Sequence, residues 1–239
     1  MIIEIKDLIF ASPGSAAVLK NISLSIKKGE KVGVIGSNGS GKSTLVYHLN
    51  GLNKPTSGSV AIDGLKIEKS TAETVRRKVG LLFQNPDDML FMPRIIDDLL
   101  FGPLNVGMNR DEALVKAAEF LKMFDIAEFA DRPPFTLSQG QRRFAALAAV
   151  LMMDPEILVM DEPTSDLDPF HRRKLINLLQ KRNETMVTVS HDLDFISDTC
   201  ERVILLLNGK IQADGKASDI LSNRELLENN QMELPLRLQ

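Results

Sequence analysis

Residues 36–44 read GSNGSGKST, which fits the pattern Gly, four residues of any type, Gly, Lys and then Ser or Thr. A short apolar strand is predicted before this loop, at residues 31–35, and a helix after it, at residues 42–49. In such a loop the glycines let successive backbone N–H groups point at an anion, and the helix N-terminus adds about half a positive charge. We therefore expect Lys42 to reach the outer phosphates of a nucleotide and the Ser43 hydroxyl to bind Mg²⁺. The expected phosphate-binding residues are Gly36, Ser37, Asn38, Gly39, Ser40, Gly41, Lys42, Ser43 and Thr44.

Polar side chains follow three of the strands that the sequence predicts. Asp161 and Glu162 come directly after the continuous apolar run of residues 157–160, which is typical of a central strand in a parallel sheet. Gln84 and His191 each follow another predicted strand. Because open α/β sheets bind their ligands at the carboxyl ends of the strands, we expect these side chains to meet the nucleotide.

Hydrolysis of a nucleotide requires an anchor for the metal, a base for water and a contact to the γ-phosphate. We expect Gln84 and Asp161 to bind Mg²⁺ together with Ser43, and Gln84 also to position the water. Glu162 is expected to accept the proton of the attacking water, and His191 to donate to the γ-phosphate. The alternative for each residue is a polar side chain that merely ends a strand.

The sequence LSQGQ at residues 137–141 begins a second helix whose start could face phosphate. Ser138 opens this helix, and Gln141 lies where a capping box requires it. One nucleotide does not need two such helix starts from one chain, so we expect two chains to meet head to tail. The residues offered to the partner's nucleotide would be Ser138, Gln139, Gly140 and Gln141. The alternative is an ordinary capped helix.

The remaining segments predict one large α/β domain. Early strands that alternate polar and apolar residues, with a hairpin turn at Asp63 and Gly64, predict antiparallel pairing beside the core. Residues 85–153 have a helical composition, and a terminal hairpin is expected after residue 202. From about Ser218 the polar, leucine-spaced tail predicts a single helix.

The overall composition is that of a soluble globular protein. The 239 residues carry a net charge of −3, which is too small to favour binding to nucleic acid or to anionic lipid. Cys200 is the single cysteine, so an internal disulfide is excluded, and we interpret it as a small buried side chain. The longest apolar run, residues 145–153, is far shorter than the roughly 20 residues of a membrane span. Any work at a membrane is therefore expected to proceed through a partner.

Together these motifs resemble the nucleotide-binding domain of ATP-binding cassette (ABC) proteins. The matching elements, in the family's order, are GSNGSGKST (Walker A), Gln84 (Q-loop), LSQGQ (signature), ILVMDE at residues 157–162 (Walker B), SDLD at residues 165–168 (D-loop) and His191 (switch histidine). The resemblance implies an α/β fold: a P-loop NTPase (RecA-like) core with an antiparallel β subdomain and an inserted helical subdomain at about residues 85–153. It divides the chain into one domain, residues 1–224, and a short helical tail, residues 225–239.

The same resemblance implies a Mg²⁺-dependent ATPase that closes as a head-to-tail dimer around two ATP molecules. Asp168 would then contact the Walker A loop of the partner. Three positions depart from the family's pattern. Ser12 stands where an aromatic ring usually contacts adenine, which leaves Phe10 as the alternative contact, and Gln139 stands where the family most often has Gly. The sequence also ends soon after Pro235, earlier than is usual for the subgroup named next.

Two stretches, FQNPDDMLF at residues 83–91 and DDLLFGPLNVGMNRDEA at residues 97–113, are similar to the ATPases of energy-coupling-factor (ECF) transporters, which import vitamins and transition-metal ions. By this resemblance the chain acts peripherally at the cytoplasmic face of the membrane. Its expected partners are a second ATPase, identical or not, and a transmembrane coupling subunit that docks near Gln84 to Met92; no nucleic acid is expected. Residues 89–92 are apolar enough to receive a helix, and the alternative is that they pack internally. The alternative functions are the ATPase of another ABC importer, a non-transport ABC switch protein and a regulatory subunit with weak turnover.

Overall fold

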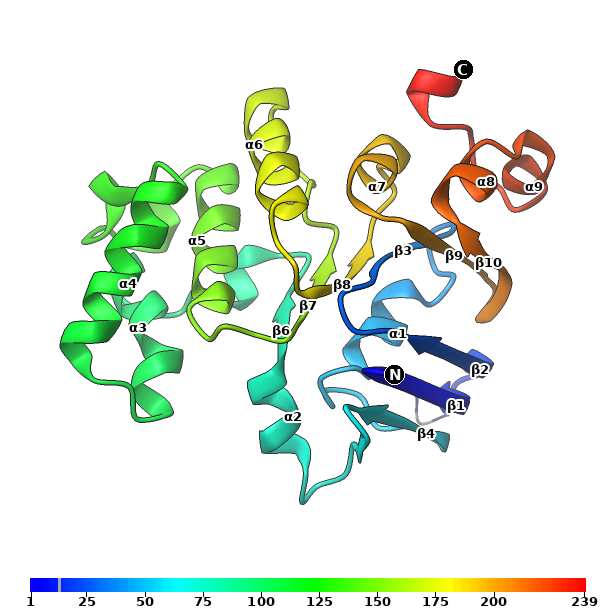
Figure 1. The fold of residues 1–239 in the computed structure, drawn as a ribbon, viewed down its shortest axis with the longest axis horizontal. Helices are drawn as coiled ribbons and strands as arrows, with labels where there is room; N and C mark the ends of the chain where they lie inside the picture. The colour runs from blue at the N-terminus through cyan, green and yellow to red at the C-terminus, as the bar shows by residue number, and fades with distance from the viewer. Residues whose placement is uncertain (13) are drawn as a thin grey trace.

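A six-stranded sheet forms the centre of the computed structural model, which describes residues 1–12 and 14–239 (Figure 1). The strand order is β10-β9-β3-β8-β7-β6; the five strands from β9 to β6 are parallel, and β10 pairs antiparallel with β9. The strands are β3 (Lys31–Ile35), β6 (Val79–Leu82), β7 (Ile157–Asp161), β8 (Thr185–Val189), β9 (Arg202–Leu207) and β10 (Lys210–Lys216). Every residue of β7 and β8 is buried, as the continuous apolar runs predict.

A second, antiparallel sheet lies beside the first, with strand order β2-β1-β4-β5. Its strands are β1 (Ile3–Ala11), β2 (Ala17–Ile26), β4 (Ser57–Ile62) and β5 (Leu65–Lys66). The predicted hairpin turn between β4 and β5 is confirmed: Asp63 and Gly64 both have positive φ, at 50° and 77°, which matches the right-handed twist of the strands.

Helices α1 to α7 fall into three groups around the main sheet (Figure 1). α1 (Lys42–Tyr47) lies between the two sheets, and α2 (Ala72–Lys78) leads into β6. α3 (Ile95–Asn105), α4 (Arg110–Met123) and α5 (Gln139–Leu151) pack together beside β6 and form the inserted helical part. α6 (Pro169–Gln180) and α7 (Leu193–Thr199) pack on the face of the sheet opposite α1. The fold class expected from the sequence is confirmed.

Alternate residues of the central strands enter two separate apolar cores. In β7, Ile157 and Val159 face α1 and the antiparallel sheet, whereas Leu158 and Met160 face the helical layer. From Arg143 onward α5 is buried on nearly every face, and Phe144 stacks on Phe124 with ring centroids 5.1 Å apart. The strand ends and α5 are therefore held from both sides.

The prediction of one C-terminal helix is wrong. The tail contains two short helices, α8 (Ala217–Leu221) and α9 (Arg224–Asn229), and then a single 3₁₀ turn, Leu236–Leu238. The break comes at Asn223, whose side chain accepts a hydrogen bond from the Leu226 N–H at 3.0 Å and so starts a new helix. No helix in the described part of the chain is long and apolar enough to cross a membrane.

Candidate nucleotide-binding and catalytic site

The loop between β3 and α1 is folded tightly around the Lys42 ammonium group. Lys42 is 8% exposed, and its Nζ donates to the carbonyl oxygens of Gly36 at 2.8 Å and Ser37 at 3.0 Å. Gly36 has a φ of 147°, and a Cβ there would lie 2.1 Å from the Leu206 carbonyl oxygen, so only glycine fits. Burial lowers the pKa of Lys42, while the carboxylates of Glu162 and Asp161 oppose the shift. The loop thus holds a buried cation at the start of α1, where the sequence predicts the phosphates of a nucleotide.

Asp161, at the end of β7, offers a buried carboxylate oxygen that fits a metal ion. Its side chain is fully buried; Oδ2 accepts a hydrogen bond from the Tyr47 hydroxyl at 2.9 Å, and Oδ1 has no partner among the described residues. Burial raises the pKa of Asp161, and the Ser43 and Tyr47 hydroxyls and the Lys42 charge counter the shift. A lone carboxylate beside a hydroxyl suits Mg²⁺, which prefers oxygen ligands and takes most of them from phosphates and water. The described residues contain no group of three or more His, Cys, Asp or Glu that could enclose a metal on their own.

Glu162 and His191 are in direct contact at the ends of the adjacent strands β7 and β8. Glu162 Oε2 accepts hydrogen bonds from His191 Nδ1 at 2.7 Å, from the His191 backbone N–H at 3.2 Å and from the Ser190 hydroxyl at 3.4 Å. The Glu162 side chain is 11% exposed and the His191 ring 69% exposed. Glu162 also has a positive φ of 49°, which a non-glycine residue adopts only where its surroundings hold it. The structure therefore brings the expected base and the expected γ-phosphate contact together, and His191 also lines the cleft described below.

Gln84 lies at the same edge of the sheet. Two residues before it, Leu82 pairs with Met160, the residue that precedes Asp161. The Gln84 side chain is exposed, as a residue that contacts a bound ligand should be. The strand ends therefore place Gln84, Asp161, Glu162 and His191 along one edge, as the sequence predicts.

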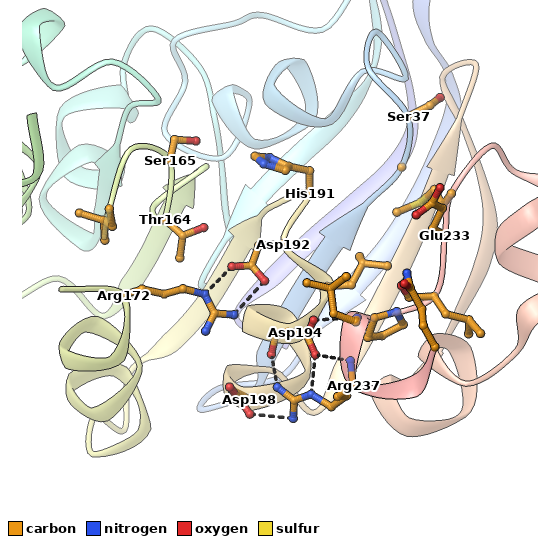
Figure 2. Close-up of a pocket in the computed structure, with 18 of the residues that line it drawn as sticks. Ser37, Thr164, Ser165, Arg172, His191, Asp192, Asp194, Asp198, Glu233 and Arg237 are labelled. Atoms are coloured by element: carbon orange, nitrogen blue, oxygen red, sulfur yellow. Dashed lines mark hydrogen bonds and ion pairs between the residues drawn. The ribbon is translucent and has the colours of Figure 1, made fainter. Parts of the chain in front are cut away.

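A cleft of about 1150 Å³ opens between the phosphate-binding loop, His191, the D-loop and the C-terminal tail (Figure 2). Figure 2 shows two arginines whose ion pairs in this cleft sequence reasoning missed. Arg172 Nε and Nη2 bind Asp192 at 2.6 and 2.8 Å, and Arg237 of the tail binds Asp194 at 2.6 Å and Asp198 at 2.9 Å. Both arginines hold α7, which begins just after Asp192. Only the helix-capping position of Asp192 carries a local signal in the sequence.

The signature segment forms the predicted capping box but lies away from its own phosphate loop. The Gln141 N–H donates to Ser138 Oγ at 3.3 Å, and the Ser138 N–H donates to Gln141 Oε1 at 2.8 Å. Ser138 and Gln139 are exposed at the start of α5, and among the described residues none of positions 138–141 lines the cleft. Gln139 Nε2 instead donates to Asp166 Oδ2 of the D-loop at 2.8 Å.

Two further expected contacts have local roles. Asp168 caps α6, where its Oδ1 accepts from the His171 N–H at 2.9 Å and its Oδ2 contacts His171 Nδ1 at 2.6 Å. The His171 N–H and ring therefore lower the pKa of Asp168. Phe10, the alternative adenine contact to the exposed Ser12, packs edge-on against His48 with ring centroids 4.9 Å apart.

Comparison with known proteins identifies the family to which this arrangement belongs. A family model described as ABC transporter matches residues 19–165. A putative ABC transporter ATP-binding protein of Geobacter sulfurreducens is 45% identical over 238 residues, which cover 100% of this chain and 96% of that protein. The energy-coupling factor transporter ATP-binding protein EcfA of Methanocaldococcus jannaschii is 41% identical over 239 residues, covering 98% of this chain and 86% of that protein.

Solved structures agree with this assignment. CbiO1 from Clostridium perfringens, described as part of the ABC transporter complex CbiONQ, superposes with a TM-score of 0.81 at 31% identity and covers 95% of this chain and 93% of its own. The ATP-binding cassette MJ0796, in a dimeric post-hydrolysis state with ADP and phosphate, gives a TM-score of 0.82 at 31% identity. The match covers 90% of this chain and 98% of that one. The chain, with its phosphate-binding loop and the adjoining row of strand-end side chains, therefore belongs to the ABC transporter ATP-binding family and is an ATPase.

Proposed function

We propose that this chain is the Mg²⁺-dependent ATPase subunit of an energy-coupling-factor-type importer, and that it powers the uptake of a micronutrient, a vitamin or a transition-metal ion. The observation that carries the proposal is the 41% identity, over nearly the whole chain, to a relative named as the ATP-binding protein of such a transporter. The site, the signature segment and an exposed aromatic surface each support one part of it.

The phosphate-binding loop and the strand ends divide the chemistry between them. Lys42 and the loop N–H groups hold the phosphates of ATP, and Ser43, Gln84 and Asp161 are placed to hold Mg²⁺, which would neutralise phosphate charge. Oε2 of Glu162 is occupied by its three hydrogen-bond donors, which leaves Oε1 to accept a proton from water as the water oxygen bonds to the γ-phosphorus and the bond from that phosphorus to ADP breaks. His191 Nδ1 keeps the Glu162 carboxylate in place, and the exposed ring faces the cleft.

Two copies are needed to complete each site. Ser138 and Gln139 are exposed at the start of α5, where the helix N-terminus can face another molecule, and neither residue lines the cleft beside the phosphate loop of the same chain. We propose that the signature segments of a head-to-tail pair cover each other's ATP, and that Asp168 contacts the partner's loop. The second copy is either this chain or a non-identical ATPase, and the pair closes on ATP and opens after hydrolysis.

An exposed aromatic surface lies beside the Gln84 segment. We define it by Phe91, 63% exposed, Phe101, 43% exposed, and Phe135, 81% exposed. The rings of Phe91 and Phe101 pack edge-on with centroids 5.0 Å apart, and Phe91 and Phe135 line one groove of about 340 Å³. Exposed apolar groups of this size favour docking of a partner helix over a solvated surface.

Residues 84–92, which we call the docking segment, are held by hydrogen bonds and joined to α5 by an ion pair. Buried Asp98 Oδ1 accepts from the N–H groups of Phe91 at 3.0 Å and Met92 at 3.1 Å, so the loop keeps its shape while the Phe91 ring stays exposed. Asp87 pairs with Arg142 of α5 at 2.9 Å. Leu90 by contrast is buried. Within residues 89–92, internal packing therefore applies to Leu90, whereas the exposed Phe91 is available for docking. We propose that a helix of the transmembrane subunit docks on the aromatic surface, which places the chain peripherally at the cytoplasmic face of the membrane.

Co-purification from detergent-solubilised membranes tests this proposal. The chain at native expression should bring down an integral-membrane scaffold and a membrane-embedded substrate-binding protein, identified by mass spectrometry. The double variant Phe91→Ser, Phe135→Ser should lose both and still bind ATP, whereas Val115→Ser, an equally exposed control at 64% on α4, should keep them. Recovery of a permease pair of another architecture would refute the subgroup, and recovery of ribosomes or DNA without membrane protein would refute transport.

A further inference from the structure

The single tyrosine of the chain touches the expected metal site. Tyr47 is the last residue of α1 and follows Ser43 by four positions, so the two side chains share one face of the helix. Its hydroxyl donates to Asp161 Oδ2 at 2.9 Å, across a separation of 114 residues in the sequence. The helix that starts at the phosphate-binding loop thus presents two hydroxyl groups, one turn apart, toward the Walker B strand.

The Tyr47 ring is held in position from the other side. It packs edge-on against Phe83, with ring centroids 5.6 Å apart and an angle of 90° between the planes, and both rings are half-buried. Phe83 directly precedes Gln84, the other expected metal-binding residue. The ring therefore fills the space between α1 and the end of β6, which leaves the hydroxyl little freedom to leave Asp161.

We propose that Tyr47 is a positioning residue for Mg²⁺: its hydroxyl holds Asp161 Oδ2 so that Oδ1 is presented to the metal and its water. Two observations carry this assignment. Asp161 is fully buried, and its two oxygens are treated differently by the protein, because Oδ2 has a hydrogen-bond donor and Oδ1 has none among the described residues. A carboxylate fixed in this way binds a metal without first giving up rotational freedom.

The size of the effect follows from what the hydroxyl supplies. Loss of a hydrogen bond to a metal-binding carboxylate typically weakens metal affinity by about 10-fold to 100-fold. Because Asp161 is expected to act with Ser43 and the phosphates, we expect the lower end of this range. The loop amides and Lys42, which hold the phosphates, do not contact the Tyr47 hydroxyl, so ATP binding without metal should not change.

The test is a Mg²⁺ titration of Tyr47→Phe, which removes one oxygen atom and keeps the ring. Binding of a fluorescent ATP analogue is measured first in EDTA and then with increasing Mg²⁺, and thermal unfolding checks that the variant folds. In EDTA we expect the variant to bind the ATP analogue with wild-type affinity. The Mg²⁺ concentration that gives half of the metal-dependent change in fluorescence should rise by about 10-fold. Phe83→Leu, which removes the supporting ring and keeps the hydroxyl, should shift the titration less, and Asp161→Asn should abolish the response.

Two outcomes would overturn the assignment. A Tyr47→Phe protein with the wild-type Mg²⁺ titration would show that the hydroxyl does not position Asp161. A variant that misfolds, or that loses ATP affinity in EDTA by the same factor as in Mg²⁺, would assign Tyr47 to the packing of the loop and not to the metal. The inference requires binding of ATP and Mg²⁺ but no transmembrane partner, so its failure and a failure of the transport proposal are separate results.

Discussion

Replacement of Glu162 by Gln tests the assignment of the base most directly, because it removes one ionisable oxygen and little else. Glu162 Oε2 accepts from His191 Nδ1, the His191 N–H and the Ser190 hydroxyl. The Gln side chain has the same length, and its carbonyl oxygen can accept the same hydrogen bonds. The variant should therefore fold with the loop and the cleft unchanged.

The expected losses of activity and of stability differ widely. A general base contributes about 10²-fold to 10⁴-fold in rate, which corresponds to about 3–5 kcal/mol at the transition state. In the folded protein, a hydrogen bond to a charged acceptor becomes one to a neutral acceptor, which costs about 1 kcal/mol. For a chain of this size that lowers the melting temperature by about 2–4 °C.

The assay combines phosphate release with the oligomeric state. Glu162→Gln should bind ATP normally, release phosphate at least about 100-fold more slowly, and accumulate as a closed dimer in ATP and Mg²⁺ on size-exclusion chromatography. Glu119→Gln, an exposed position on α4 outside the cleft, is a matched control that should behave as wild type. Turnover within about threefold of wild type, in a variant that melts as expected, would refute the role of Glu162 as base.

Three other experiments test the phosphate loop, the burial of Cys200 and the ion pair of Asp192. Gly36→Ala should abolish ATP binding in a fluorescence titration, because a Cβ there lies 2.1 Å from the Leu206 carbonyl oxygen and the loop must shift. Burial raises the pKa of the Cys200 thiol to about 12, so iodoacetamide at pH 8 should label the unfolded protein rapidly and the native protein hardly at all. Burial acts to raise the pKa of Asp192, but the hydrogen bonds and charge of Arg172 outweigh burial, and the pKa is lowered. The stability that Asp192 adds is therefore fully present above its ordinary pKa of 3.8 and is lost as the pH falls below that value, through the lowered pKa of the folded state. The gap in melting temperature between wild type and Asp192→Asn should accordingly be larger at pH 7 than at pH 3.

Features that depend on local chemistry were predictable from the sequence. The start of α5 is one, because a capping box needs only Ser138 and Gln141, three positions apart, and both of its hydrogen bonds are present. The placement of Glu162 and His191 at one edge of the sheet is another, because parallel strands bring their carboxyl ends to the same edge, although their direct contact was not predicted. In both cases a short pattern and one rule of geometry are sufficient.

Contacts between distant segments were not predictable in this way. The Tyr47 hydroxyl meets Asp161 only because α1 packs against β7, and no pattern near Tyr47 indicates it. Arg237 contacts Asp194 across 43 residues, and this contact depends on the tail turning back at α8 and α9 rather than continuing as one helix. Such contacts depend on how elements pack, which the periodicity of a single segment does not contain.

The buried Arg143 connects α5 to the backbone of Glu162, the proposed base, in a way that bears on coupling. It is 1% exposed, and its two terminal nitrogens donate to the backbone carbonyls of Glu162 at 3.2 Å and Ser165 at 3.3 Å. Gln139, one turn earlier on α5, donates to Asp166 in the same loop. Hydrogen bonds from a buried cation are costly to break, because the charge would be left without partners. A displacement of α5 must therefore either carry the loop after Glu162 with it or lose these bonds. If a partner docks at residues 84–92, which Asp87 joins to Arg142 of α5, a displacement there reaches the proposed base Glu162 through these few hydrogen bonds.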